Sequence, residues 1–462
     1  MDNNQKVNSG LNSVYTTECL QPIFEYVQDN SSRFLTDLQE LVRQPSISAQ
    51  NKGMVECAQL LEGKMKEAGI DARTIPTGGY PVVFGEVKSK DSERTILVYG
   101  HYDVQPPEPL EEWESPPFAA KIQDGKIFGR GASDMKCGVM AVVKGVESCI
   151  KTKQGVPVNV KIIFEGEEEI SSPHLEEFVK NNKELLKAEA RIDYDGPTDV
   201  CLGDKGMLYV QLTAKEDRGD IHSKEATVLV SPTWRLIWAL NTLKNQSETV
   251  TIQGFYEDAK DPNEMDIALI KQLTLDPEEL HSGRLLDGLE TKEKILRRRL
   301  FSPTCNISGI MSGYTGSGAK TVLPRMASAK VDMRLVPDQD PEDIFTKLKR
   351  HLEKHGFNDI EVTKIGQLWP SKTPASEKIV KAVIKSAEMA HGRKPKVEPI
   401  SPASGPTYVF ARHLKLPTVS TGAQTTTKRN HAPNEYVEVN DYLAAIKKLA
   451  AILYNYRNDD TS

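Results

Sequence analysis

The chain has 462 residues, 27% of them charged, and a formal net charge of −6, which gives no reason to expect a nucleic-acid partner. This length predicts two domains, and apolar runs such as Ile96–Tyr99 are far too short to cross a membrane. The six cysteines are scattered without a Cys-x-x-Cys pair, which disfavours disulfides or a thiolate zinc site. The N-terminus resembles no signal peptide, so we expect a cytoplasmic protein.

Helices and strands are predicted to alternate up to about Gly206, after an initial arm of about 20 residues without periodicity. The alternation predicts an α/β fold, a mixed open sheet flanked by helices. The predicted helices are Leu20–Val42, Val55–Ala68, Met135–Lys151 and His174–Leu186, and the predicted strands are Val82–Val87, Thr95–Tyr99, Val158–Phe164 and Arg191–Tyr194.

The pattern changes after Gly206, where half-exposed strands and amphipathic helices predict an inserted α+β domain at residues 207–370. Residues 1–206 and 371–462 would then form the other domain. The inserted domain is predicted to contain strands Met207–Ala214, Ala329–Val336 and Ile360–Ile365, helices Ser231–Lys244 and Pro341–His355, and a helical stretch from Pro262 to Arg299. Helix Glu377–Ala390, strand Pro417–Ser420 and helix Asp441–Tyr456 follow.

Histidine and acidic side chains occur in five separated patches. Ligands gather at the carboxyl ends of strands in open α/β sheets, so patches that follow strands can converge. Two imidazoles and several carboxylates are about what two divalent metal ions need, with one carboxylate left as a base. The patches are His101-Tyr102-Asp103, Asp134, Glu167-Glu168-Glu169, Asp195 and His431.

Each patch has a simpler interpretation when taken alone. His101 could lie in a surface loop, Asp134 could be an N-cap, Asp195 precedes a Gly-Pro turn, and His431 lies in a loop without an apolar face. The glutamate run could be a solvated face. It directly follows an apolar strand, however, so one glutamate could bind metal while its neighbour acts as a general base.

Three motifs resemble the dinuclear zinc exopeptidase and deacylase family, in the dipeptidase branch. This family contains carnosinase-type dipeptidases, aminoacylase, carboxypeptidase G, acetylornithine deacetylase and succinyl-diaminopimelate desuccinylase. Its fold would be a zinc-exopeptidase-like catalytic domain with an inserted lid that often also dimerises. The motifs are Gly100-His101-Tyr102-Asp103-Val104-Gln105-Pro106, Gly129-Arg130-Gly131-Ala132-Ser133-Asp134-Met135-Lys136 and Glu165-Gly166-Glu167-Glu168-Glu169-Ile170-Ser171-Ser172.

The resemblance implies a role for each residue of the predicted metal centre. Asp134 would bridge two divalent ions, zinc foremost, with manganese or cobalt as alternatives. His101 and Asp195 would complete the ligands of one ion, and Glu169 and His431 those of the other. Glu168 would be the general base, and Asp103 would orient His101.

The resemblance also implies substrate-binding residues in the lid. His222 would polarise the substrate carbonyl, commonly from the partner subunit, and Arg334 would bind the substrate carboxylate. Their simpler interpretations are an exposed loop and a solvated strand face. Three further residues are expected to contact the substrate: Asn306, Ser404 and Gly405.

The sequence departs from the family pattern at three positions. Met135 stands where many relatives have a second aspartate, Ser171 replaces a usual glycine, and Lys224 replaces the glycine that usually follows the lid His-Ser pair.

These features predict a metal-dependent exopeptidase of dipeptidase type that acts on small peptides as a homodimer, without a nucleic-acid or membrane partner. The alternative within the enzyme class is an N-acyl-amino-acid deacylase, which would use the same metal chemistry. The alternative from another class is an inactive binding protein of the same fold.

Overall fold

A computed structural model describes residues 19–152, 155–275, 283–424 and 429–458. The predicted N-terminal arm lies almost entirely outside these residues. The chain divides into two compact units. Unit 1 comprises Met1–Gly203, Thr373–Pro399 and Val409–Ser462, and unit 2 comprises Asp204–Lys372 and Ile400–Tyr408. In the sequence, unit 2 is therefore inserted into unit 1.

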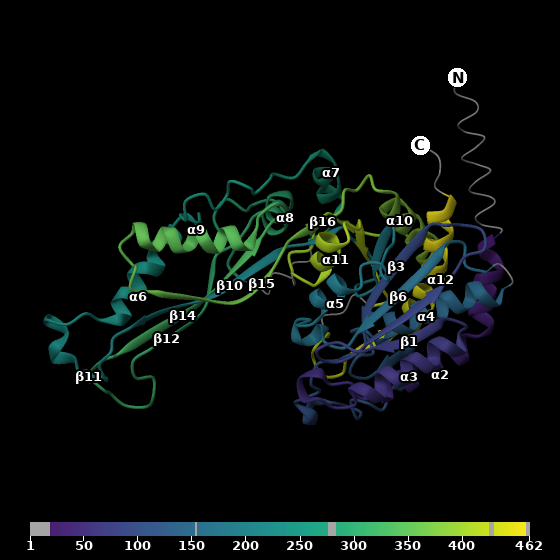
Figure 1. Ribbon diagram of the computed structural model, residues 1–462, viewed down its shortest axis with the longest axis horizontal. Coiled ribbons are helices and arrows are strands. Elements are labelled where there is room, and N and C mark those ends of the chain that lie inside the picture. Colours follow the sequence, from purple (N-terminus) through teal and green to yellow (C-terminus); the bar gives the residue numbers. More distant parts are fainter. Residues whose placement is uncertain (1–18, 153–154, 276–282, 425–428, 459–462) are drawn as a thin grey trace, which may run out of the picture. The chain divides into compact units, whose positions relative to one another are not determined.

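Unit 1 is built on an eight-stranded sheet in the order β1-β2-β6-β3-β7-β18-β8-β17 (Figure 1). Its centre is parallel, since β3 pairs in parallel with β6 and β7, and β7 with β18. At one edge, β2 runs antiparallel to β1 and β6. The strands are β1 (Asp71–Ile75), β2 (Val82–Val87), β3 (Thr95–His101), β6 (Asn159–Glu165), β7 (Ala190–Asp193), β8 (Val200–Cys201), β17 (Val397–Glu398) and β18 (Thr418–Ser420).

Helices flank this sheet, which confirms the expected fold class. α4 is buried along nearly its whole length, and most of its residues are apolar, although Lys136, Lys144 and Glu147 are buried as well. The helices are α2 (Ser31–Arg43), α3 (Met54–Glu67), α4 (Lys136–Lys151), α5 (Leu175–Asn181), α10 (Lys378–His391), α11 (Thr407–His413), which starts in unit 2, and α12 (Val439–Asn458).

The single helix predicted from Leu20 to Val42 is interrupted. Residues 19–29 are helical, Asn30 forms a turn, and α2 begins at Ser31. Asparagine competes for backbone hydrogen bonds in non-helical conformations, so it is a frequent point of interruption. The apolar spacing continues through the turn, and for this reason the periodicity alone missed it.

Unit 2 contains a four-stranded antiparallel sheet in the order β12-β14-β10-β15. One face of β10 and β14 carries Leu208, Val210, Leu212, Val331 and Met333, which are buried in the core of this unit. The strands are β10 (Gly206–Lys215), β12 (Asn306–Ser312), β14 (Met326–Leu335) and β15 (Glu361–Leu368), and a separate pair is formed by β11 (Ile221–His222) and β13 (Val322–Leu323).

Two helices, α6 (Pro232–Asn241) and α9 (Pro341–Lys354), cover the apolar face of this sheet (Figure 1). The stretch predicted as helical from Pro262 to Arg299 forms only α7 (Glu264–Gln272) and α8 (Lys292–Phe301) among its described residues. Asn263 forms a capping box at the start of α7, and Thr291 caps α8, so each helix has its own start signal.

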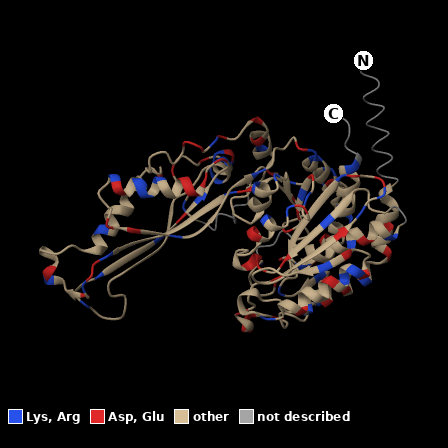
Figure 2. Cartoon of the chain, in the orientation of Figure 1, with Lys and Arg blue, Asp and Glu red and all other residues tan. Residues whose placement is uncertain are grey.

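Acidic and basic side chains are interspersed over the described helices of both units (Figure 2). In the described part of the chain, no helix is long and apolar enough to span a membrane.

Candidate metal centre

The parallel strands of unit 1 bring the sequence-predicted ligands to one edge of the sheet. His101 is the last residue of β3, Glu168 and Glu169 follow β6 in a short 3-10 helix, and Asp195 lies two residues beyond β7. The carboxyl ends of adjacent parallel strands meet at the same edge, which is the position where α/β sheets bind ligands.

Asp134 lies between two histidines. Its Oδ1 is 3.4 Å from His101 Nε2, and its Oδ2 is 3.1 Å from His431 Nε2. The N-cap position of α4 is occupied by Met135 and has no side-chain cap, so the Asp134 carboxylate does not serve as an N-cap. One oxygen toward each imidazole is the arrangement of a carboxylate that can bridge two cations.

The candidate ligand atoms fall into two groups; Asp134 belongs to one group, and its Oδ1 faces His101 of the other. Among the described residues, these are the groups of three or more His, Cys, Asp or Glu side chains that could hold a metal ion, with the candidate atoms of each group within 4.8 Å of one another. One group is His101, Glu168 and Asp195, and the other is Asp134, Glu169 and His431. All five sequence-predicted ligands and the predicted base are thus brought together.

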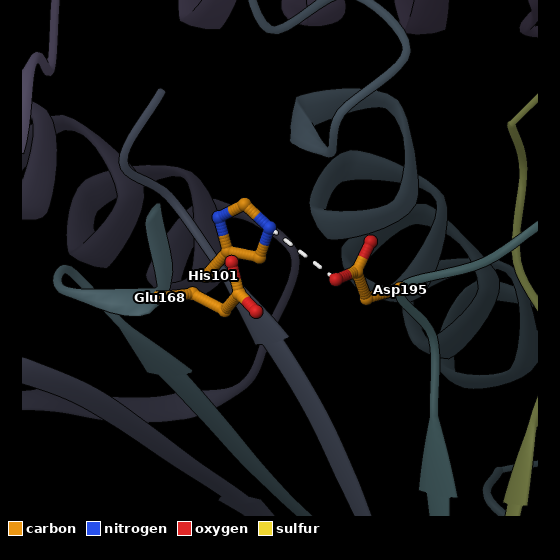
Figure 3. Close-up of side chains that lie close together, drawn as sticks. All are labelled: His101, Glu168 and Asp195. Carbon is orange, nitrogen blue, oxygen red and sulfur yellow. Dashed lines mark ion pairs between the residues drawn. The ribbon is translucent and has the colours of Figure 1, made fainter. Parts of the chain in front are cut away.

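His101 shows that this site suits a cation. Its side chain is fully buried, and Nε2 has no hydrogen-bond partner among the described residues although it lies 3.4 Å from Asp195 Oδ2 (Figure 3). The other ring nitrogen, Nδ1, lies 3.1 Å from the Asp103 carbonyl oxygen and 3.3 Å from Asp103 Oδ1. With Nδ1 donating to Asp103, Nε2 has a lone pair that faces two carboxylates, which is repulsive unless a cation or proton intervenes.

Asp103 does more than the sequence predicted. Its Oδ1 accepts the backbone N–H of Glu168 at 3.2 Å, and its Oδ2 accepts the N–H of Glu169 at 3.1 Å. A single buried carboxylate therefore fixes the orientation of His101 and the backbone of both functional glutamates.

The three glutamates of the run have different surroundings. Glu167 is buried against His174, whose Nδ1 lies 2.9 Å from Glu167 Oε2, and it therefore takes no part in either group. Glu169 Oε2 lies 3.3 Å from His431 Nε2 and accepts a hydrogen bond from Gln105 Nε2 at 2.9 Å. The Glu168 carboxylate lies beside the His101 ring (Figure 3).

Burial and neighbouring charges shift the pKa values of the carboxyl groups in opposite directions. Burial, reinforced by Asp195 and Glu169 and opposed by His101, raises the pKa of Glu168 well above its usual range. Burial also raises the pKa of Asp195 to about 6, against the opposing effect of His101. Burial opposes the ionised form of Asp134, but the neighbouring His101 and His431 imidazoles outweigh burial and hold the pKa of Asp134 below its usual range.

Two side-chain amides contact metal-ligand candidates and were not predicted from the sequence. Gln424 Nε2 donates to Asp195 Oδ1 at 2.7 Å, and Gln105 binds Glu169 as described above. Gln105 lies within the first motif, which was an available signal, whereas nothing in the sequence near Gln424 connects it to Asp195.

Two of the departures from the family pattern have structural consequences. Met135 is buried, and its sulfur accepts the backbone N–H of His101 at 3.1 Å. Ser171 ends the 3-10 helix of Glu168 and Glu169 with φ 72°, a left-handed conformation. Glycine adopts this conformation without a steric cost, so the backbone geometry explains why glycine would suit this position.

The candidate substrate residues Arg334 and Ser404 are in contact within unit 2. Arg334 Nη1 donates to Ser404 Oγ at 2.7 Å, and Ser404 Oγ donates to the Gly206 carbonyl at 3.1 Å. Asn306 pairs with Asp332 across β12 and β14, and its Nδ2 donates to Asp332 Oδ1. Asp332 and Arg334 are two residues apart on β14, so they share the face opposite the core.

Gly405 follows Ser404, and a Cβ added there would have only the Asp204 side chain nearby, at 3.9 Å. His222 lies elsewhere in unit 2, at the exposed end of β11. Its Nδ1 accepts the Lys224 N–H at 3.1 Å. The neutral ring then carries its proton on Nε2, where it is available for donation.

A sheet edge that gathers two groups of candidate His and carboxylate ligands is the arrangement expected of a metal-dependent hydrolase. The family model described as Peptidase family M20/M25/M40 matches residues 97–455, and the chain belongs to this family. The expected family and the expected class of enzyme, a metallopeptidase, are therefore confirmed.

Three similar proteins extend this result. An M20 family metallo-carboxypeptidase structure from Sulfolobus solfataricus is 38% identical with a TM-score of 0.85, over 92% of this chain and 99% of that chain. A Beta-Ala-His dipeptidase of Rattus norvegicus is 28% identical over 76% of this chain and 78% of its own. A Cys-Gly metallodipeptidase of Candida albicans is 26% identical over 95% of this chain and 97% of its own.

Proposed function

We propose that this peptidase is a dipeptidase, which hydrolyses the peptide bond of dipeptides or short peptides with a free C-terminal carboxylate. The observation that carries the proposal is the position of Asp134 between His101 and His431, with Glu168 beside one ligand group. Two relatives with this activity in their names, one matching nearly the whole chain, support it.

The ligand candidates fit two divalent ions. Zinc suits two imidazoles and three carboxylates, and the same set accepts manganese or cobalt. Bound there, the ions would act as Lewis acids that polarise the scissile carbonyl and acidify water. His101 and Asp195 would hold one ion, Glu169 and His431 the other, and Asp134 both.

Glu168 would carry the proton in this reaction. It forms no ion pair with another described residue, and burial raises its pKa, which suits a group that accepts a proton and then returns it. It would take a proton from the attacking water and donate it to the leaving amine. Asp103 holds the Glu168 backbone amide and thereby keeps this carboxylate in position.

His222 and Arg334 would select and activate the substrate. With Nδ1 occupied by the Lys224 amide, His222 presents Nε2–H as a donor, as needed to stabilise a developing oxyanion. The planar guanidinium of Arg334, supported by Ser404, matches a substrate carboxylate. Asn306 and Gly405 would complete this subsite.

We also infer that the enzyme is a homodimer formed through unit 2. Trp234 and Trp238 on α6 are 56% and 52% exposed with their rings stacked, and Ile310 and Met311 on the edge strand β12 are 59% and 64% exposed. Exposed apolar groups and an unpaired strand edge favour association. Sedimentation should give twice 51.4 kDa, and Trp238→Glu should shift the protein toward the monomer. A monomeric wild type would contradict the inference.

All six cysteines are free, which favours a reducing compartment and supports a cytoplasmic location.

A substrate panel tests the proposed activity. Dipeptides, the same peptides extended at the N-terminus, C-terminally amidated dipeptides and N-acyl amino acids would be assayed with zinc, manganese and cobalt. We expect the highest kcat/KM for free dipeptides. The metallo-carboxypeptidase relative makes a preference for longer peptides the second candidate. Turnover of N-acyl amino acids alone would identify a deacylase instead.

A further inference from the structure

Glu435 is a buried carboxylate that the proposed reaction does not use. Its side chain is fully buried, yet four donors converge on its two oxygens. Oε1 accepts the backbone N–H groups of Ser133 and Asp134 at 2.8 and 2.9 Å. Oε2 accepts the N–H of Gly131 at 3.0 Å and Arg130 Nη1 at 2.7 Å.

These four hydrogen bonds offset the free-energy cost of burying the Glu435 carboxylate. An isolated carboxylate would be neutralised in an apolar interior. Burial does raise the pKa of Glu435, while Arg130 and the backbone N–H groups oppose the shift. Arg130 is itself 1% exposed, packs over the Trp113 ring and donates to the Pro106 carbonyl. A buried ion pair such as Glu435–Arg130 adds little net stability. Stability alone therefore does not explain its arrangement.

The position of Glu435 provides that explanation. One of its hydrogen bonds comes from the amide of Asp134 itself, the aspartate between the two histidines. Glu435 also lies four residues after His431, and its backbone carbonyl accepts the Gly129 N–H at 2.9 Å. A single residue therefore ties the segment that carries Asp134 to the segment that carries His431.

We propose that Glu435 is a positioning residue, which presets the Asp134 carboxylate between the two ligand groups before metal binds. This inference rests on the metal centre within the proposed function. Fixing the backbone of Asp134 lowers the conformational entropy lost when both its oxygens bind cations. Without Glu435, the segment from Gly131 to Asp134 would lose its acceptors and the aspartate its fixed position.

Glu435→Gln is the variant that tests this role. It keeps the volume but replaces one acceptor oxygen by an NH₂ group, which must face two of the four donors. Glu147→Gln is the matched control, because Glu147 is 3% exposed and paired with Lys144 and Arg33 at a distance from the site along α4. Glu435→Gln removes one buried ion pair and Glu147→Gln removes two, but only Glu435→Gln touches the Asp134 segment.

The readouts are metal affinity, by competition with a chromogenic chelator, and hydrogen exchange of the metal-free protein. For Glu435→Gln we expect metal binding weakened by about 10- to 100-fold and faster exchange of the Ser133 and Asp134 amides. Glu147→Gln should leave both unchanged. Wild-type affinity in a folded Glu435→Gln protein, or an equal loss in Glu147→Gln, would overturn the proposal.

Two further measurements do not depend on that variant folding. Glu435→Asp keeps the charge but withdraws it by one methylene, so its metal affinity should fall below that of the wild type, and an unchanged affinity would count against the proposal. In the metal-free wild type, the Ser133 and Asp134 amides should already be protected, and rapid exchange there would refute presetting. None of these readouts uses a substrate, so the inference and the dipeptidase proposal can fail separately.

Discussion

The two units hold their functional side chains in different ways. In unit 1, His101, Asp103 and Glu169 are buried or nearly so, and each has more than one polar neighbour. In unit 2, His222 and Asn306 are exposed, and each is oriented by a single hydrogen bond through its side chain. Metal ligands need fixed positions, whereas residues that select a substrate need to be accessible. Apart from His431, whose side chain is 55% exposed, this contrast leads us to propose that unit 1 is a preset centre and unit 2 a recognition surface.

The largest effect should come from the base in the preset centre. Glu168→Gln should lower kcat by about 100- to 10,000-fold, since the amide cannot accept the proton. The metal content should remain that of the wild type. Steady-state kinetics with metal analysis would check both.

The control for this variant is its neighbour. Glu167→Gln also removes a carboxylate from the run, but Glu167 is bound to His174 and should leave kcat nearly unchanged. Loss of one metal ion in Glu168→Gln would contradict the role of base and make Glu168 a ligand, which its place beside His101 and Asp195 also permits.

A smaller effect should follow removal of the exposed donor in unit 2. His222→Ala should lower kcat by about 100- to 1,000-fold, as for other lost oxyanion donors, with unchanged metal affinity because the centre belongs to unit 1. His355 is another exposed histidine of unit 2, so His355→Ala is the control and should leave kcat and metal affinity unchanged. If His222→Ala also weakened metal binding, the proposal that unit 1 alone binds the metals would be contradicted.

Arg334→Lys should act on binding more than on chemistry. Lysine keeps the charge but not the planar bidentate geometry, so KM for dipeptides should rise about tenfold, with little change in kcat. C-terminally amidated peptides, which lack the carboxylate, should show no such difference between variant and wild type. An equal rise in KM for amidated peptides would show that Arg334 does not act by binding the substrate carboxylate. Arg350→Lys, on the exposed side of α9, is the control.

The smallest expected effect is on stability and comes from backbone strain at Ser171 in unit 1. Ser171→Gly should stabilise the protein by about 0.5 kcal/mol, as the relief of about 1–2 kcal/mol in the left-handed conformation exceeds the entropy cost of about 0.5–1 kcal/mol for glycine. Urea unfolding of the metal-free protein would measure this. A destabilised variant would show that the Ser171 side chain compensates for its backbone.

The sequence predicted much of unit 1 because its signals are local and repeated. A β-branched run identified β6, and its end located the glutamates beyond it. The turn at Asn30 and the contact of Gln424 with Asp195 were missed. The turn does not interrupt the apolar spacing of the sequence. The contact between Gln424 and Asp195 joins residues that are 229 positions apart in the chain.

Unit 2 was harder to predict, for a physical reason. The strand β12 is exposed along most of its length, so it lacks the alternation that a core-facing strand displays, and no strand was predicted there. In unit 1, the residues of the glutamate run alone left its division open, and only the family resemblance assigned Glu168 and Glu169; in the structure, contacts with Asp103 and His174 distinguish the three glutamates.

We propose that one aspartate, Asp134, serves both metal sites in unit 1. The most direct measurement is the metal content of the protein after saturation with zinc and removal of the excess. We predict two ions per chain for the wild type, and fewer than one for Asp134→Ala, because both sites lose a shared ligand. Two ions retained by Asp134→Ala, or a single ion in the fully active wild type, would contradict the account.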